Sequence, residues 1–422
     1  MDRNIEYRNG QMTMESVTMR QIAAAVGTPC YVYSAAGMER AYRRLEAAVL
    51  ASKIPTTICF AVKANPNLAV INLFSKLGSG ADVVSGGELE RALRAGIAAE
   101  RIVFSGVGKT RAEIARALEV GIGQFNVESP SELAMINRLA AAVNLVAPVV
   151  FRVNPDVDAA THAKISTGKK DNKFGIAIDE IPSLWQLALK LPNVKLLGLA
   201  VHIGSQINEL GPSRQAFIKM RELVLNLRSQ GAVIERLDLG GGLAISYRGE
   251  KTVAPEDFIA LISEVIGDLG CQLILEPGRY LVGDSGVLLT EVLYRKSQSG
   301  REFAIVDAAM NDLMRPALYG SYHHIVPVAE AADGAPLTPF DIVGPICEST
   351  DSFTSGRELP PLAEGDLLAF LDAGAYGASM SNGYNSRPLV PEVMVKGDRF
   401  DVIRPRIGAE EFYKFDKLCN EC

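Results

Sequence analysis

The chain has 422 residues, of which 48% are hydrophobic and 22% charged, as in ordinary soluble enzymes and binding proteins. Its length favours two domains, and its net charge of -6 at pH 7 argues against a nucleic-acid or anionic-membrane partner. The polar start is not a secretory signal, and the longest apolar stretch, residues 139–151, is too short to span a bilayer. Six scattered cysteines suit a reducing cytoplasm, and the pair Cys419 and Cys422 is interpreted as a frayed tail rather than a metal site.

Between residues 57 and 279, short β-branched runs that end in polar residues or glycine alternate with helical patterns. The runs are TICFAVKA, GADVVSGG, RIVFSG, GQFNVES, PVVFRVN, LLGLAVHIGS, RLDLGGG and LILEPGR. Thr110 with Glu113 predicts a capping box, and Ser129 before Pro130 predicts another helix start. Strands that alternate with helices pair in parallel, so eight of them predict a (β/α)8 barrel; an open doubly wound sheet is the alternative.

The pattern changes after Arg279. Short strands with turn residues and little helical periodicity predict a mostly antiparallel β-sandwich or β-barrel domain. Its first strand is expected at Cys30–Ser34, ahead of a helix at residues 37–50. We therefore expect a barrel at residues 36–280 and a β domain formed by residues 1–35 and 281–422.

Polar residues follow the predicted barrel strands at their carboxyl ends, where barrels of this kind place their chemistry. Each has an ordinary structural explanation on its own: a lysine that reaches solvent, a hydrogen-bonded histidine, glycines in a tight turn. Together they form a convergent ring. Its members are Lys63, Asp82, Ser85, Glu128, Arg152, Asn154, His202, Ser205, Gly240, Gly241, Gly242, Glu276, Gly278 and Arg279.

This ring fits pyridoxal 5'-phosphate. The glycines after strand seven are expected to expose backbone N–H groups, and Arg279 adds donors, at the loops where barrels commonly bind phosphate. Lys63 would hold the aldehyde as a Schiff base, and Glu276 would keep the ring nitrogen protonated. His202 would stack on the ring. The residues thus predict a cofactor-dependent enzyme that acts at Cα of an amino acid.

The chain also resembles the barrel-fold, pyridoxal-phosphate-dependent decarboxylases, and within them the bacterial meso-diaminopimelate decarboxylases. The likeness runs nearly end to end. The segments that carry it are GTPCYVY, FAVKANPN, GADVVSGGEL, ISTGKKDNKFGI, HIGSQI, LDLGGG, EPGR, MRPALYG, GPICESTD and GAYGASMSNGYNSRPLVPEV.

The resemblance implies roles for single residues. Lys63 and His202 match the Schiff-base lysine and the stacking histidine, and Glu276 matches the partner of the ring nitrogen. Asp82 and Arg152 are expected to face the cofactor. The phosphate contacts match Ser205, the three glycines, Gly278, Arg279 and Tyr384.

The resemblance also implies how the substrate is held. Arg279, Arg315 and Tyr319 match the group at the distal end of diaminopimelate, Tyr376 a substrate-side tyrosine, and Cys347 with Glu348 residues that reach a neighbouring subunit's site. Cys347 is the first candidate to reprotonate Cα, and Lys63 the second. A homodimer with shared sites is expected.

The implied reaction is decarboxylation of meso-2,6-diaminopimelate at its D-centre to L-lysine and CO2. A sister enzyme acting on ornithine, arginine or carboxynorspermidine is the nearest alternative. An alanine-racemase-like enzyme, a cofactor-free Schiff-base aldolase and a non-catalytic cofactor-binding protein remain as more distant readings. Glu276 disfavours the racemase, because that class pairs the ring nitrogen with a less acidic partner.

Overall fold

A computed structural model describes residues 5–159, 167–168, 172–332 and 334–419. The chain forms two compact units. One comprises Glu39–Ser246 and Lys251–Leu281, and the other comprises Met1–Met38, Tyr247–Glu250 and Val282–Cys422. The short segment Tyr247–Glu250 belongs to the second unit although the chain on both sides of it belongs to the first.

The first unit is built on a closed barrel of eight parallel strands. The strands follow each other in the order β9-β11-β12-β13-β5-β6-β7-β8, and β8 pairs with β9 to close the ring. They are β5 (Thr56–Ala61), β6 (Gly80–Val83), β7 (Ile102–Phe104), β8 (Gln124–Val127), β9 (Ala147–Asn154), β11 (Val194–Val201), β12 (Arg236–Asp238) and β13 (Gln272–Leu275). The closed (β/α)8 barrel is therefore confirmed over an open sheet. A further short strand, β10 (Ile176–Ala177), pairs with β9.

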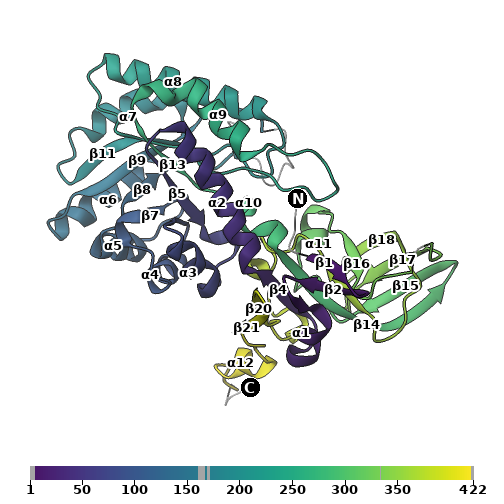
Figure 1. The fold of residues 1–422 in the computed structure, drawn as a ribbon. Helices are drawn as coiled ribbons and strands as arrows, with labels where there is room; N and C mark the ends of the chain where they lie inside the picture. The colour runs from purple at the N-terminus through teal and green to yellow at the C-terminus, as the bar shows by residue number, and fades with distance from the viewer. Residues whose placement is uncertain (1–4, 160–166, 169–171, 333, 420–422) are drawn as a thin grey trace. The chain divides into compact units, whose positions relative to one another are not determined.

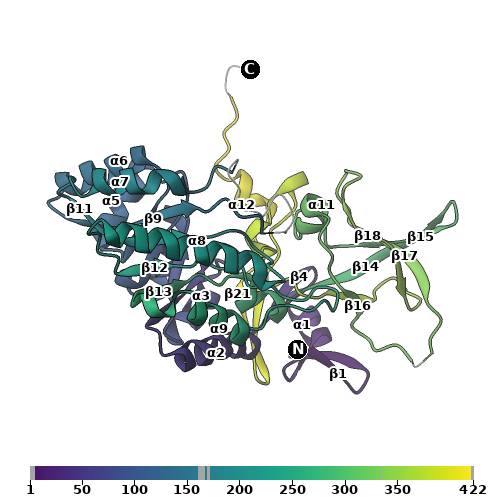
Figure 2. The same ribbon diagram turned by 90° about the horizontal axis from the view of Figure 1, so that it is seen from above.

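Helices cover the outer side of these strands (Figures 1 and 2). They are α2 (Ala35–Ser52), α3 (Leu68–Lys76), α4 (Gly86–Arg94), α5 (Arg111–Val120), α6 (Pro130–Ala142), α7 (Ile181–Ala188), α8 (Leu210–Ser229) and α9 (Pro255–Ile266). The short helix α10 (Arg279–Val282) follows the carboxyl end of β13. Both predicted helix starts are confirmed: Thr110 forms a capping box with Glu113, and the side chain of Ser129 caps α6 with Pro130 in its first turn.

The second unit is mostly antiparallel β-structure. One sheet has the order β18-β17-β15-β14-β4-β20-β21, and β1-β2-β3 form another. The strands are β1 (Ile5–Arg8), β2 (Gln11–Met14), β3 (Val17–Thr18), β4 (Cys30–Ser34), β14 (Gly286–Gln298), β15 (Arg301–Val306), β16 (Ile325–Pro327), β17 (Thr338–Val343), β18 (Ser352–Leu359), β19 (Leu367–Phe370), β20 (Glu392–Lys396) and β21 (Arg399–Arg404), with helices α1 (Met19–Val26), α11 (Arg315–Tyr319) and α12 (Ala409–Tyr413).

The expected N-terminal strand at Cys30–Ser34 is present as β4, which lies between β14 and β20. The core beside it joins the two ends of the chain: Val32 of β4 packs with Val287 of β14 and Val393 of β20. The sequence reading did not anticipate the three-stranded sheet at residues 5–18, whose buried Met12 and Met14 complete this core.

Two segments that the sequence analysis singled out lie partly outside the residues that the structure describes. Cys419 is exposed, whereas Cys422 lies beyond the described residues. The segment ISTGKKDNKFGI is described only at Thr167, Gly168 and residues 172–176. Within the described ranges, no helix combines the length and apolar character needed to cross a membrane.

Candidate active site

Lys63 lies just beyond β5 rather than at its last residue. The strand ends at Ala61, and Lys63 sits in a single 3-10 turn, Val62–Ala64. The sequence reading extended the strand to the lysine because the apolar run continues through Val62. Asn67 accepts a hydrogen bond from the N–H of Ala69 and so starts α3. The turn thus breaks the strand and leaves the amine at the barrel's carboxyl end.

The amine of Lys63 forms an ion pair with Asp82 of the neighbouring strand β6, with 2.8 Å between Nζ and Oδ2. The Asp82 side chain is fully buried, and its Oδ1 has no hydrogen-bond partner among the described residues. A buried carboxylate oxygen without a donor is costly unless a ligand supplies one.

His202 follows β11 and is held in one tautomer. The backbone N–H of Gly241 donates to Nδ1 across 3.2 Å, so this nitrogen carries no proton. Burial, with the positive charges of Arg152 and Lys63 adding to it, lowers the pKa of His202 well below its usual range. His202 is therefore a neutral, flat ring at the cavity wall, suited to stacking rather than to acid catalysis.

The three glycines after β12 are required by close packing. A Cβ at Gly240 would lie 2.7 Å from the Val201 carbonyl oxygen, and one at Gly241 would lie 2.2 Å from the Glu276 carbonyl oxygen. Two of their N–H groups are already used: that of Gly240 donates to Asp238 and that of Gly241 to His202. The expectation that all three expose N–H groups needs correction, because two of them already donate to protein side chains.

Glu276 follows β13 and is only 8% exposed. It is hydrogen-bonded to Asp238 at the end of β12, and Asn126 Nδ2 lies 3.4 Å from its Oε1. Burial, together with the negative charges of Asp238 and Asp82, raises the pKa of Glu276 well above its usual range. Two buried carboxyl groups in hydrogen-bond contact share a proton.

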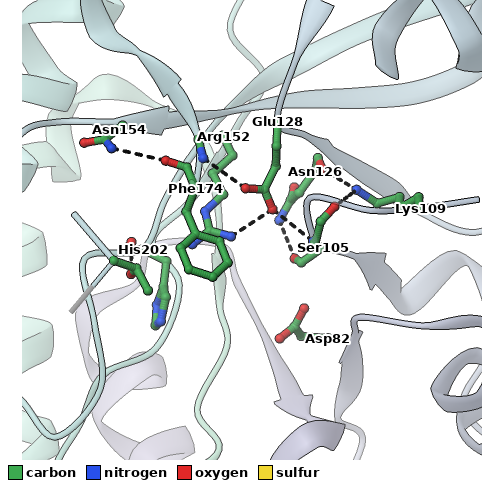
Figure 3. Close-up of polar contacts among 12 residues, drawn as sticks. Asp82, Ser105, Lys109, Asn126, Glu128, Arg152, Asn154, Phe174 and His202 are labelled. Atoms are coloured by element: carbon green, nitrogen blue, oxygen red, sulfur yellow. Dashed lines mark hydrogen bonds and ion pairs between the residues drawn. The ribbon is translucent and has the colours of Figure 1, made fainter. Parts of the chain in front are cut away.

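Arg152 of β9 is fixed by a second buried carboxylate, that of Glu128. Its Nη1 lies 2.9 Å from Glu128 Oε1, and its guanidinium lies 4.9 Å from the ring centre of Phe174 (Figure 3). Glu128 also accepts hydrogen bonds from the N–H groups of Gly106 and Gly175. Glu128 thus ties three loops at this end of the barrel.

These side chains surround one cavity of about 410 Å³, within the size range of small-molecule sites. The polar groups that line it are Lys63, Ser105, Asn126, Arg152, Thr167, His202, Asp238 and Glu276. An amine, a neutral aromatic ring, an acid with a bound proton and an orphaned carboxylate oxygen fit pyridoxal 5'-phosphate. The residues present could therefore hold this cofactor.

Ser205 and Arg279 lie together but outside this cavity wall. Arg279 Nη2 donates to Ser205 Oγ across 3.1 Å, and both belong to the barrel unit. Arg279 is only 6% exposed. Gly278 precedes it at the start of the turn into α10, where its carbonyl accepts from the N–H of Leu281.

The other predicted site residues lie in the second unit. Arg315 begins α11 and is buried; its Nη1 lies 3.0 Å from His323 Nε2, and its guanidinium lies 4.7 Å from the ring centre of Tyr247. Arg315 is therefore held inside the second unit rather than exposed at its surface. Tyr319 ends the same helix and is half-buried.

Cys347 and Glu348 lie on an exposed loop with Tyr384 nearby. The hydroxyl of Tyr384 donates to Glu348 Oε2 across 2.9 Å, and the N–H of Cys347 donates to Asn385. Hydrogen bonds from Thr350 and Tyr384 lower the pKa of Glu348. The loop therefore exposes a thiol and an anionic carboxylate on consecutive residues.

The backbone of this second-unit region is locally strained. Tyr376 has a φ of 56°, a left-handed conformation that bulky residues rarely adopt. Such strain persists where surrounding structure imposes it and often marks functional sites.

Sequence reasoning missed Asn126 and Asp238, which line the cavity from inside the barrel. Each lies two residues after another polar residue, Gln124 and Arg236 respectively, on a short strand. Residues two apart share one face of a strand, so polar pairs at this spacing were the available signal of a polar barrel interior.

The comparisons with known proteins identify the family. The family model for the pyridoxal binding domain of pyridoxal-dependent decarboxylases matches residues 36–283. The chain is 47% identical over 410 residues to a diaminopimelate decarboxylase of Zymomonas mobilis (96% of this chain, 97% of the relative) and 48% identical over 412 residues to that of Pseudomonas aeruginosa (98% of each).

Two solved structures extend the likeness to the whole fold. The Helicobacter pylori diaminopimelate decarboxylase complexed with L-lysine superposes with a TM-score of 0.90 at 39% identity, covering 94% of this chain and 98% of that one. The M. jannaschii enzyme in co-complex with L-lysine gives 0.94 at 36% identity, covering 99% of each chain. The chain belongs to the diaminopimelate decarboxylases, within the pyridoxal-dependent decarboxylases.

Proposed function

We propose that this protein decarboxylates meso-2,6-diaminopimelate at its D-centre, releasing L-lysine and CO2. The observation that carries the proposal is the barrel cavity that joins Lys63, His202 and Glu276, in a chain whose relatives at 47% and 48% identity are diaminopimelate decarboxylases. The reaction is the last step of lysine biosynthesis.

Bound pyridoxal 5'-phosphate supplies an electron sink for the pair left when the bond from Cα to the carboxylate breaks. Lys63 would anchor it covalently, and the neutral ring of His202 would stack on it. Glu276 would meet the ring nitrogen, and burial with the nearby charges of Asp238 and Asp82 raises the pKa of this carboxyl. Asp82 holds the Lys63 amine, and Arg152 adds a positive charge beside His202.

The phosphate is assigned to the carboxyl ends of β12 and β13. Ser205 and Arg279 already lie in hydrogen-bond contact, and Gly242 and Gly278 border the same turns. Tyr384 is assigned to the same phosphate because it matches a phosphate contact of the family. An arginine with a hydroxyl beside it offers charge-assisted donors to phosphate oxygens.

Selectivity for diaminopimelate is assigned to the residues that meet its distal carboxylate and ammonium. Arg279 and Arg315 pair with the carboxylate, Glu348 meets the ammonium, and Tyr319 and Tyr376 border the substrate. The His323 and Tyr247 contacts hold the Arg315 guanidinium in place before substrate arrives. Ornithine has no second carboxylate, so it would not form the charge-assisted hydrogen bonds to these arginines that diaminopimelate forms.

The proton that replaces CO2 at Cα comes from Cys347 first and from Lys63 as the second candidate. Cys347 is exposed on its loop, and its N–H is fixed by Asn385. We further propose that the active unit is a homodimer with shared sites, and that it works in the cytoplasm, where the five described cysteines stay reduced.

Product analysis tests the proposal directly. Purified protein with pyridoxal 5'-phosphate is offered meso-diaminopimelate, ornithine and arginine side by side, and the amino acids formed are separated. We expect lysine from diaminopimelate and little product from the others. Putrescine or agmatine as the main product would favour a sister decarboxylase instead.

Lys63→Ala supplies the matched variant. It should remove both the visible absorbance band of the bound cofactor and the release of lysine, because no other described cavity residue carries an amine. A Lys63→Ala protein that keeps both properties contradicts the assignment.

A further inference from the structure

The buried carboxylate of Asp238, which the proposed reaction does not use, is hydrogen-bonded to Glu276. Asp238 ends β12, is 1% exposed, and accepts three hydrogen bonds. Its Oδ2 lies 3.0 Å from both Gln124 Nε2 and Asn126 Nδ2, and its Oδ1 lies 3.0 Å from the N–H of Gly240. All three donors are neutral amide groups, so none of them offsets the negative charge of the carboxylate.

The orientation of these amide groups follows from one arginine at the base of the barrel. Arg236 is only a donor, and its Nη1 lies 3.1 Å from Gln124 Oε1, so the Gln124 amide must turn its Nε2 the other way. That Nε2 donates to Asn126 Oδ1 across 2.7 Å. The Nδ2 of Asn126 must then face Asp238, Glu276 and Ser105.

This relay ends on the pair of carboxyl groups. Asn126 Nδ2 reaches Asp238 Oδ2 and Glu276 Oε1 together, and the two carboxyls are hydrogen-bonded to each other. Of the two, Glu276 is the better placed to donate their shared proton, because Asp238 already accepts from three N–H donors. Lys63, Asp82, Cys59 and Arg236 are the other titratable groups that face the pair.

We propose that Asp238 is a positioning residue for the cofactor: held by the Arg236–Gln124–Asn126 relay, it orients the Glu276 carboxyl and makes it a stronger hydrogen-bond acceptor for a protonated ring nitrogen. The inference rests on the proposed function only in that Glu276 meets the cofactor. A fixed negative charge in the water-poor barrel favours a positive ring nitrogen nearby far more than it would in water. In this role Asp238 acts on the cofactor through Glu276.

The test follows the ring nitrogen itself. The holoenzyme is reconstituted with pyridoxal 5'-phosphate labelled at that nitrogen, and its NMR resonance is titrated with pH. In the native protein the nitrogen should stay protonated from about pH 6 to 9. In Asp238→Asn the midpoint of deprotonation should fall by at least about one pH unit, and kcat should fall about tenfold or more with KM nearly unchanged.

Two further variants make the outcome decisive. Gln124→Leu removes one donor to Asp238 without changing any charge, and should move the midpoint in the same direction by a smaller amount. Asp341→Asn is the control, since Asp341 is a buried aspartate of the other unit that accepts from Ser355 and Gly356. It should leave the resonance where it is in the native protein.

An unshifted resonance in folded Asp238→Asn and Gln124→Leu overturns the inference. If Asp238→Asn does not fold, Gln124→Leu decides alone. Failure of the proposed function is separate, because a native protein that forms no lysine still gives a readable nitrogen titration.

Discussion

Lys63 acquires its chemical character from residues on other strands. A lysine at a strand end is ordinarily a solvated cation, yet here its amine is paired with a fully buried aspartate and shares a cavity with Glu276 and His202. Gly240 and Gly241 also depend on residues of other strands, because a Cβ at either position would clash with backbone atoms there. Adding a methyl group at one of these glycines should therefore disturb the site.

Gly241→Ala should weaken cofactor binding by tenfold or more and destabilise the fold by about 1–3 kcal/mol. The new Cβ would stand 2.2 Å from the Glu276 carbonyl oxygen, which is backbone and cannot rotate away. Equilibrium binding of pyridoxal 5'-phosphate and denaturant unfolding measure the two effects. Gly211→Ala, at an exposed helix position with no atom within 4 Å, is the control and should neither weaken cofactor binding nor destabilise the fold. Native-like affinity in Gly241→Ala would contradict the packing argument.

Asp312→Asn should flatten the dependence of stability on pH between about pH 4 and pH 7. Burial, with Asp307 and Asp351 adding to it and Arg387 opposing it, raises the pKa of Asp312 to about 7. A raised acid pKa stabilises the folded protein below the unfolded value, and this stabilisation is lost as the pH rises through the folded value. The loss is at most about 4 kcal/mol.

Urea unfolding at pH 5 and at pH 8 measures this difference. The free energy of unfolding should decrease from pH 5 to pH 8 in the native protein, and this decrease should be smaller in Asp312→Asn. An equal change in both proteins would show that Asp312 does not titrate in this range.

At the scale of single elements, the barrel helices carry their boundaries in local sequence. The side chain of Thr110 accepts from the N–H of Glu113, and Glu113 in turn accepts from the N–H groups of Thr110 and Gly86. One glutamate therefore caps the start of α5 and binds the start of α4. Caps of this kind depend on residues three apart, which is why sequence predicts them well.

Thr110→Ala should cost about 1 kcal/mol of stability, since it removes the side-chain acceptor for one helix N–H. Arg111→Ala changes the next, exposed residue of the same helix and serves as the control, with an expected change near zero. Thermal or urea unfolding of the three proteins measures the cost. Equal stability of Thr110→Ala and the control would mean that water replaces the cap.

Elements and cavity interior were not equally predictable from sequence. Strand beginnings, helix caps and the polar strand ends follow from local patterns, so Lys63, His202 and Glu276 were found. The contacts of Asn126 with Asp238 join strands 112 residues apart in the chain, and no local pattern carries that distance. The hydrogen bond from the Gly241 N–H to His202 was missed for the same reason, since the two residues are 39 positions apart in the chain.

At the scale of the whole molecule, the predicted site residues are divided between two compact units. Lys63 and its partners belong to the barrel unit, whereas Cys347, Glu348 and Tyr384 belong to the β unit and are exposed on it. The hydrogen bond from Tyr384 to Glu348 keeps this exposed group together. These three residues are exposed, and they are far along the chain from the polar ring of the barrel. This is the arrangement expected if a second copy of the chain completes each site.

Mixing two inactive variants tests whether sites are shared. Lys63→Ala and Cys347→Ala homodimers should each have little activity, since each lacks one group in every site. If a site takes Lys63 from one protomer and Cys347 from the other, a mixed dimer has one doubly altered site and one native site. After subunit exchange of equal amounts, about a quarter of the native activity should return, because half of the dimers are mixed and each has one working site. Activity assays before and after exchange, with affinity tags to prove that mixed dimers formed, measure this recovery. Mixed dimers without recovered activity would place both residues in the site of the same protomer.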